Sequence, residues 1–175
     1  WQNPLIGHMQ HNLRDPSRDH LHGRVYRLTV DGRPPMEIAK MMGKPVIEVL
    51  EHLESKTKSV RYRARLELSG RDSHEVTDEV VQWARQFDAQ SANDAQSLVE
   101  ALWIHQMHRI PNENLLRAVL SSPVPQARAA GVRALREWFD QIPAGGRFLL
   151  AAANDPHPRV RAEAVVAATY FEGPA

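Results

Sequence analysis

The side chains best suited to chemistry lie near the start of the chain, where residues 7–24 read GHMQHNLRDPSRDHLHGR. Between residues 8 and 22 there are four histidines, two arginines and two aspartates. The segment is too polar and too rich in turn-forming residues to belong to a hydrophobic core. Three interpretations of it are open: a metal site, an anion or cofactor site, and a purely structural loop.

The metal interpretation rests on the spacing of the histidines. His20 and His22 are two apart, so an extended chain places both imidazoles on one side, whereas His8 and His11 share one face of a helical turn. An aspartate of the same segment supplies a ligand of a suitable type. On this interpretation, His20 and His22 are the metal ligands.

The second interpretation is a site for a carboxylate, a phosphate or a cofactor. Arg14 and Arg18 are each followed by an aspartate that orients the guanidinium for bidentate binding. His8 or His11 then acts as a base near neutral pH. In the third interpretation the same arginines and aspartates pair with one another and fix a loop that seals the end of a sheet.

Length, charge and composition exclude several classes of protein. The chain has 175 residues, a net charge of +1 and no Cys, which excludes disulfides, thiolate metal sites, a Cys nucleophile and covalently attached c-type haem in this chain. It contains no apolar run of the roughly 18–20 residues that cross a bilayer. Because it opens at Trp1 without an initiator Met or a signal sequence, we expect a piece of a longer polypeptide or a processed product.

One strand is expected, over residues 24–30 (RVYRLTV), in which Tyr26, Leu28 and Val30 alternate with more polar positions. A strand needs a partner, which is either the first six residues or a sheet in a part of the protein outside this chain. The following DGRPP predicts a turn, with Gly32 at positive φ, and a rigid link.

Helix formers dominate residues 36–171. Asp72, three residues before Glu75, predicts a capping box. Further start signals are Asn93 or Asp94, Pro111 in a first helical turn, Pro125 after Ser122-Pro123, and the run DPHP at 155–158. The expected helices are short and closely spaced, which favours antiparallel neighbours.

A repeated pattern decides the expected architecture. The segments VRYRA, ARAAG and VRAEA place Arg three residues before a small residue, namely Ala64, Gly131 and Ala164, and a weaker copy is centred on Ala101. A period of about 30–37 residues predicts a mainly α fold, an α-solenoid of about four helical pairs in which the small residues line one shared seam. Three tryptophans are expected to fill space between helices: Trp83, Trp103 and Trp138.

The pattern of a turn Asp or Pro, then Val-Arg, then a small residue resembles the second helix of HEAT-like repeats. The resemblance is strongest at 155–165 and weakest at 93–104, where Leu98 stands in place of the Arg. In that family the turn Asp and the helix Arg form a structural ladder between repeats. The resemblance implies that Asp155 and Arg161 hold this scaffolding role here.

A more specific resemblance covers nearly the whole chain. The string IGHMQHNLRDPSRDHLHGRVYRLT and the later VRYRARLELSGRD are similar to the C-terminal part of proteins described as membrane-bound dehydrogenases in Planctomycetes-type bacteria. Those proteins resemble a glucose/sorbosone dehydrogenase β-propeller followed by HEAT-like repeats. The resemblance implies a loop and strand from the closing end of a β-propeller at 1–33, a linker at 34–44, HEAT-like helical repeats at 45–171, and a periplasmic location.

The resemblance also implies a cofactor chemistry for the parent protein. Related sugar dehydrogenases use pyrroloquinoline quinone, which implies cofactor-binding roles for Arg14 and Arg18 and catalytic roles for His8 and His11. Most of the propeller lies outside this chain, so we expect the chain alone to bind no cofactor, and pyrroloquinoline quinone or haem belongs to the full-length protein. Catalysis by this chain alone is not expected.

The expected function is a helical-repeat scaffold or interaction module, whose partners are other domains of the same polypeptide or protein subunits, without membrane insertion. One alternative is a fragment that contributes His and Arg side chains to a quinone-dependent sugar dehydrogenase-type active site. A second is a nucleic-acid-binding solenoid, which would use a row of arginines: Arg61, Arg63, Arg65, Arg128, Arg133, Arg136, Arg159 and Arg161. Interspersed Glu67, Glu137 and Glu163 disfavour nucleic acid, because they make the same surfaces mixed in charge.

Overall fold

A computed structural model describes residues 28–32 and 38–171 of the chain. The chain divides into two compact units, Trp1–Ile38 and Ala39–Ala175, which are considered separately here. Among the described residues, no helix is long and apolar enough to cross a membrane.

The described part of the first unit tests only the end of the expected strand. Residues 28–30 have no regular secondary structure, and the side chains of Leu28 and Val30 are exposed. The strand prediction is therefore wrong for these residues, because no described segment supplies the ladder partner that a strand requires; residues 24–27 lie outside the described part. Asp31 and Gly32 form the expected turn, with Gly32 at a φ of 77°.

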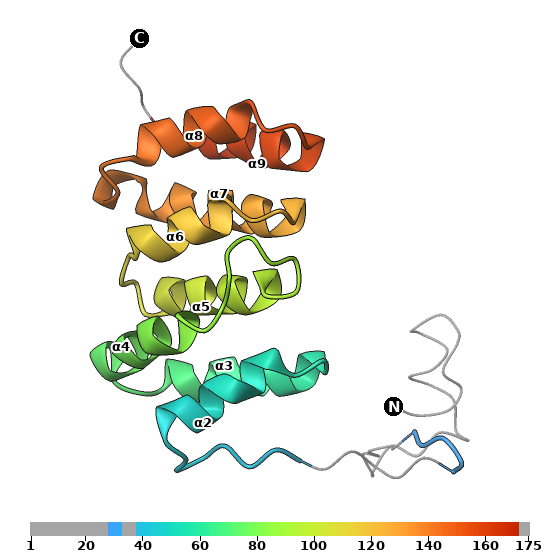
Figure 1. The fold of residues 1–175 in the computed structure, drawn as a ribbon. Coiled ribbons are helices and arrows are strands. Elements are labelled where there is room, and N and C mark those ends of the chain that lie inside the picture. Colours follow the sequence, from blue (N-terminus) through green and yellow to red (C-terminus); the bar gives the residue numbers. More distant parts are fainter. Residues whose placement is uncertain (1–27, 33–37, 172–175) are drawn as a thin grey trace, which may run out of the picture. The chain divides into compact units, whose positions relative to one another are not determined.

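The second unit is helical, and the described residues contain no strand. The predicted mainly α class is confirmed at this level. The described helices, shown in Figure 1, are α2 (Val46–Glu51), α3 (Lys58–Ser69), α4 (Ser73–Ala84), α5 (Ala95–Met107), α6 (Glu113–Leu120), α7 (Pro125–Trp138), α8 (Gly145–Ala153) and α9 (Pro158–Ala168), with 3-10 turns at η1 (His52–Glu54) and η2 (Phe139–Gln141).

Several predicted helix starts are confirmed. The Asp72 carboxylate accepts hydrogen bonds from the backbone N–H groups of His74 and Glu75, and so caps α4. Pro125 begins α7 as predicted. The start of α6 was predicted at Pro111 and lies slightly later, because the Asn112 side chain accepts from a backbone N–H inside the helix and thereby sets its first residue.

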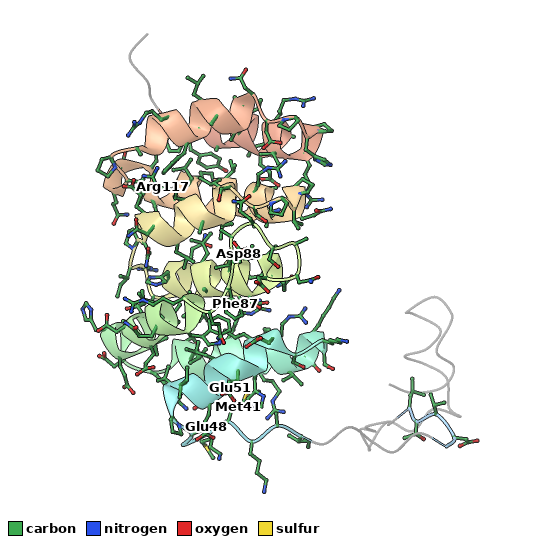
Figure 2. All side chains as sticks on the ribbon, in the orientation of Figure 1. Met41, Glu48, Glu51, Phe87, Asp88 and Arg117 are labelled. Carbon is green, nitrogen blue, oxygen red and sulfur yellow. The ribbon has the colours of Figure 1, made fainter. Side chains whose placement is uncertain are left out.

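The connection between α4 and α5 is the longest between described helices, and it includes Phe87 and Asp88 (Figure 2). Asp94 lies at the N-cap position of α5 but makes no capping bond to that helix. Its carboxylate instead accepts from the backbone N–H of Asp88 at 3.0 Å, which closes the loop on itself.

The helices of the second unit contact one another in a regular order. Within successive pairs, α2 contacts α3, α4 contacts α5, α6 contacts α7 and α8 contacts α9. Across pairs, α3 contacts α5, α5 contacts α7 and α7 contacts α9. The helices accordingly follow one another in layers (Figure 1), so that each hairpin buries its apolar face against its neighbours.

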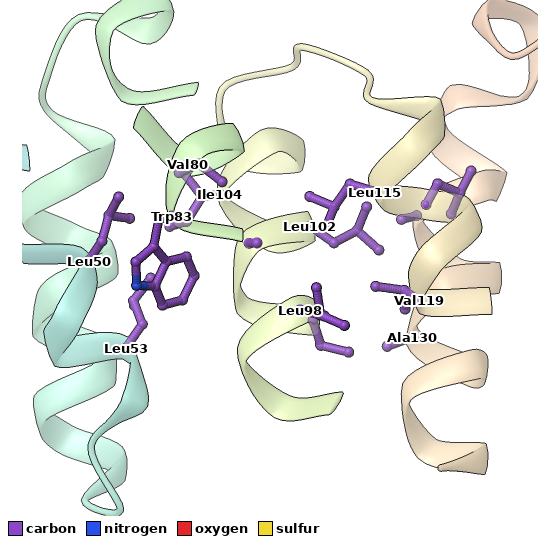
Figure 3. Packing of buried hydrophobic residues seen from close by; sticks show 14 of the residues in the cluster. Leu50, Leu53, Val80, Trp83, Leu98, Leu102, Ile104, Leu115, Val119 and Ala130 are labelled. Atoms are coloured by element: carbon purple, nitrogen blue, oxygen red, sulfur yellow. The ribbon is translucent and has the colours of Figure 1, made fainter. Parts of the chain in front are cut away.

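Most of the core is one continuous apolar cluster. Trp83 lies beside Leu50 and Leu53, and on the other side of α5 Leu102 lies toward Leu115 of α6 (Figure 3). A smaller cluster joins α7 to α8 and α9.

The tryptophan prediction holds at two of its three positions. Trp83 and Trp138 are each 3% exposed. Trp103 is only partly buried, and the Arg65 guanidinium lies over its ring at 5.5 Å from the centroid. It therefore packs against the core cluster on one side and meets a surface arginine on the other, whereas Trp83 and Trp138 are enclosed.

The four small residues of the repeated pattern lie on α3, α5, α7 and α9, and all four are buried. A Cβ added at Gly131 would lie 2.9 Å from a methyl carbon of Leu120 on α6. At this position the small residue therefore allows close approach between the two helices of one hairpin.

Candidate functional site

The residues that the sequence singles out for chemistry lie outside the described part of the chain. This applies to the catalytic candidates His8 and His11, to the cofactor-binding candidates Arg14 and Arg18, and to the metal candidates His20 and His22. Their roles stay predictions. Within residues 28–32 and 38–171, no group of three or more His, Cys, Asp or Glu side chains could hold a metal ion.

The most regular feature of the described residues is a turn that occurs three times between the helices of a hairpin. Its first residue is Ser55, Ser122 or Asp155. In each case the side-chain oxygen accepts a hydrogen bond from the backbone N–H two residues later, at 3.2, 3.2 and 2.8 Å respectively. The three turns therefore start with the same local geometry.

An arginine six residues later completes each turn. Arg61 donates to the carbonyl oxygen of Ser55 at 2.6 Å, and Arg128 donates to that of Ser122 at 2.9 Å. In the third copy Arg161 donates to the carbonyl oxygens of Asp155 and Pro156, both at 2.9 Å.

We call this combination the arginine turn. Its arginine lies three residues before the small residue of each pattern. In the α6–α7 hairpin, one short sequence pattern therefore fixes both the connection and the close contact at Gly131.

Two of the three arginine turns are linked by a partly buried ion pair. Arg128 on α7 donates to both carboxylate oxygens of Asp155, at 2.7 and 2.8 Å, and the two side chains are only 15% and 10% exposed. The hydrogen bonds from Arg128 lower the pKa of Asp155 below its ordinary value of 3.8. A second pair, Arg133 with Glu163 at 3.1 Å, joins α7 to α9.

The family resemblance implied that Asp155 and Arg161 belong to a ladder between repeats. Among the described residues, Arg161 donates to backbone oxygens of its own turn. The carboxylate of Asp155 is held by Arg128, the equivalent arginine of the preceding hairpin. Linking residues of successive hairpins is what gives the ion pair its scaffolding effect.

A buried charge cluster joins α3 to α5. Glu100 is fully buried and pairs with Arg65 at 2.9 Å and with Arg61 at 3.3 Å. Gln96 donates a further hydrogen bond to its carboxylate at 3.0 Å. Burial nevertheless raises the pKa of Glu100 above its ordinary value, although both arginines act in the opposite direction.

One histidine–serine pair has the geometry of a base beside a nucleophile. The Nδ1 atom of His108 lies 3.0 Å from the hydroxyl of Ser73. Its Nε2 atom is buried and has no hydrogen-bond partner among the described residues, so no third group orients the ring. We interpret the pair as a contact between α4 and the end of α5.

The buried imidazole of His105 supports the same end of α5. Its Nδ1 atom lies 2.9 Å from the carbonyl oxygen of Ile110, and burial lowers its pKa. The chain turns sharply here, because Arg109 has a φ of 56°, in the left-handed region.

Surface cavities of the described part of the chain include two that lie between hairpins. One, of about 240 Å³, is lined by apolar residues of α6, α8 and α9 together with Arg117, Arg128 and Asp155. Arg117, labelled in Figure 2, covers the ring of Phe148 at 5.0 Å from its centroid. The other, of about 310 Å³, is mainly apolar and lies between α4, α5 and α6. Ser73 and His108 line neither cavity.

Most arginines of the nucleic-acid alternative contact other residues of this chain. The arginine-turn side chains and Arg65 are described above, and Arg63 donates to the carbonyl oxygen of Ala39. Arg136 lies over the ring of Tyr170 at 4.7 Å. These contacts hold the guanidinium groups against the protein and do not favour a continuous phosphate-binding row.

Large apolar side chains are exposed on α8 and α9. Leu150 is 67% exposed, Val165 65% and Val166 46%. Ala153 and Ala162 are also exposed. This surface is called the α8–α9 outer face below, and it consists of Leu150, Ala153, Arg161, Ala162, Val165 and Val166.

Three comparisons with known proteins were made. A scan of protein-family models and searches of curated proteins and of solved structures give no match to this chain.

Sequence reasoning missed the first residue of two of the three arginine turns. The repeated pattern was identified from the arginine, the small residue and a preceding Asp or Pro. Ser55 and Ser122, six residues before Arg61 and Arg128, were not included. The signal was present, since Ser and Asp share the ability to accept a backbone hydrogen bond at a turn.

Proposed function

We propose that residues 39–171 form a HEAT-like α-solenoid whose function is to hold other protein domains or subunits. The observation that carries this proposal is the threefold recurrence of the arginine turn, with the same backbone and side-chain hydrogen bonds each time. Local structure that recurs in this way is expected of repeat proteins, in which each unit buries its apolar face only against its neighbours.

The contacts between hairpins support the same proposal. The pairs Arg65–Glu100 and Arg128–Asp155 each join a second helix to the following hairpin. The second helices α3, α5, α7 and α9 also contact one another in chain order. Stability is then expected to come largely from interfaces between neighbouring hairpins.

The buried polar groups of the described residues are used for structure. Glu100 and Asp155 are held by arginines, and His105 by the backbone at the end of α5. These groups fix the positions of helices relative to one another, as a scaffold requires.

The family resemblance extends the proposal to a parent protein. We propose that the solenoid belongs to a periplasmic, dehydrogenase-like protein and holds its propeller domain or a partner chain. The roles of the histidines and arginines at 8–22 within such a protein are part of the same proposal, and the observation that supports it is the sequence similarity over 6–29 and 60–72.

Site-specific photo-crosslinking in the source cells tests the scaffold function. A photoreactive amino acid is placed at Tyr62 or Val165, which are exposed on second helices, and at the exposed Gln82 of α4 as the control position. We expect a discrete adduct at one of the second-helix positions, identified by mass spectrometry as a segment of the same polypeptide or as another chain. No adduct at either position, or equal adducts at Gln82, would contradict the proposal.

A further inference from the structure

The α8–α9 outer face repeats the surface that the preceding hairpin uses to bind α8 and α9. The small residues Gly131 and Ala164 are 33 residues apart, so every position of α6 and α7 has a counterpart 33 residues later. This equivalence rests on the proposed repeat architecture, and it allows the two surfaces to be compared position by position.

On the α6–α7 hairpin this surface is covered. Ala129 and Val132 are fully buried in the apolar cluster shared with α9, and Leu120 packs against the same cluster. Arg128 is engaged by the carboxylate of Asp155, which belongs to the next arginine turn. The hairpin α8–α9 is therefore the occupant of this surface.

On the α8–α9 hairpin the equivalent surface is open. The counterparts of Ala129, Val132 and Leu120 are Ala162, Val165 and Ala153, and all three are exposed. Exposed apolar side chains grouped in this way indicate an interaction surface.

The charge on this face specifies the partner further. Arg161 is the counterpart of Arg128, but within the described residues it contacts only backbone oxygens and no carboxylate. Its free donors lie where Arg128 binds Asp155 in the preceding hairpin. An acidic side chain in the turn of the binding partner would pair with Arg161 as Asp155 pairs with Arg128.

We infer that the α8–α9 outer face binds a helical hairpin of another protein segment, with an acidic residue at the start of its inter-helix turn. This hairpin continues the stack, and its carboxylate pairs with Arg161. The apolar positions Ala162 and Val165 then become buried as Ala129 and Val132 are.

A second copy of this chain fits the face poorly. If the outer faces of two copies packed together, Arg161 of each copy would lie at the interface. The face has no free carboxylate to pair with it, because Glu163 is already paired with Arg133. The α2–α3 hairpin, placed on the face as the next unit, would offer Ser55 where Asp155 lies and Arg63 where Glu163 lies. Either arrangement lacks the acidic turn residue.

The α8–α9 hairpin itself supplies a defined probe. Inserting a second copy of residues 139–171 directly after Phe171 of the full chain keeps the 33-residue spacing and presents a second acidic turn to Arg161. Because the chain contains no Cys, the substitution Val165→Cys in the original copy gives a single thiol whose labelling rate reports whether the face is covered.

We expect the inserted hairpin to slow labelling of this thiol at least tenfold, an order-of-magnitude expectation for a surface that becomes buried. Replacing the turn Asp of the inserted copy by Asn, as a matched control, is expected to restore part of the rate. Unchanged labelling would overturn the inference, whether or not the insert folds. Concentration-dependent protection in the chain without the insert would overturn it in favour of a second copy.

The failure of this inference can be separated from the failure of the proposed scaffold. Energetic coupling between Arg128 and Asp155 is measured in the chain without the insert. If that coupling is present and the thiol stays unprotected, only the assignment of the outer face is wrong. If the coupling is absent as well, the proposed link between successive hairpins is also wrong.

Discussion

The ion pair between Arg128 and Asp155 carries the most direct energetic prediction. Arg128→Met keeps most of the aliphatic stem and removes the charge, and Asp155→Asn keeps an oxygen that can accept from the backbone N–H of His157. The two variants and their double variant form a thermodynamic cycle, and the cycle isolates the free energy that couples the two side chains.

The expected coupling follows from burial and geometry. Two hydrogen bonds of 2.7 and 2.8 Å join the groups, and the side chains are 15% and 10% exposed. A hydrogen bond to a charged group contributes about 1.5–3 kcal/mol, and an exposed ion pair less than about 1 kcal/mol. Because this pair is mostly but not fully removed from water, we expect a coupling of about 2 kcal/mol.

The pH dependence gives a second readout of the same pair. The folded-state pKa of Asp155 lies below its ordinary value of 3.8, mainly because of the hydrogen bonds from Arg128. Below pH 3.8 the unfolded chain therefore binds more protons than the folded chain, so stability is lost as the pH falls through the folded pKa. We expect this loss in the wild type and a flatter profile in Asp155→Asn.

Chemical denaturation monitored by circular dichroism measures all four chains of the cycle. Arg161→Met is the matched control, because Arg161 has the same place in its turn but binds no described carboxylate. This control loses its own hydrogen bonds to backbone oxygens, but we expect its coupling with Asp155→Asn to stay below about 0.5 kcal/mol. A coupling below about 0.5 kcal/mol, which is typical of an exposed pair, would refute the reasoning.

Three further substitutions, one of them with a matched control, test separate features of the fold. Because burial raises the pKa of Glu100, this group ionises at a lower pH in the unfolded chain than in the folded chain, and stability falls as the pH rises above 4.5. The stability of Glu100→Gln, measured against pH, should lack this fall. A profile identical to that of the wild type would contradict this prediction. Gly131→Ala should destabilise by about 1 kcal/mol net, since overpacking against α6 exceeds the gain in helix propensity, whereas Gly146→Ala, with open space around it, should stabilise in the same denaturation assay. Arg109→Gly should stabilise by about 1 kcal/mol by relieving a left-handed backbone, and a loss of stability would show that the arginine side chain matters there.

The helices could be predicted well because their signals are local. A capping carboxylate at Asp72 and a proline at Pro125 act within one helical turn, so their effect can be read from neighbouring residues. The burial of Ala64 and Gly131 was also predictable, since a small residue at a fixed place in a repeat is useful only where backbones approach closely.

The partners of buried charges could not be predicted in the same way. Glu100 reads as one more surface acid on a helix, and only the three-dimensional arrangement brings Arg61 and Arg65 from 35 or more residues away to its carboxylate. The family resemblance gave Asp155 a role between repeats but did not name its partner, because Arg128 is near Asp155 only across the hairpin interface.

The histidine-rich segment shows the other limit of sequence reasoning. Residues such as His8 and Arg14 have side chains that a functional site could use. Whether they form such a site depends on contacts between residues that lie outside the described part of the chain. Residue types predict what chemistry could occur, and only long-range contacts decide whether the side chains meet.

Native-state hydrogen exchange of the full chain with and without Arg128→Met tests the repeat scaffold most directly. If stability comes from neighbouring hairpins, the substitution should speed exchange in α8 and α9, affect α7 less, and leave α2 and α3 unchanged. Equal acceleration in α3 and α9 would show that the unit opens as a single block, and would contradict the account.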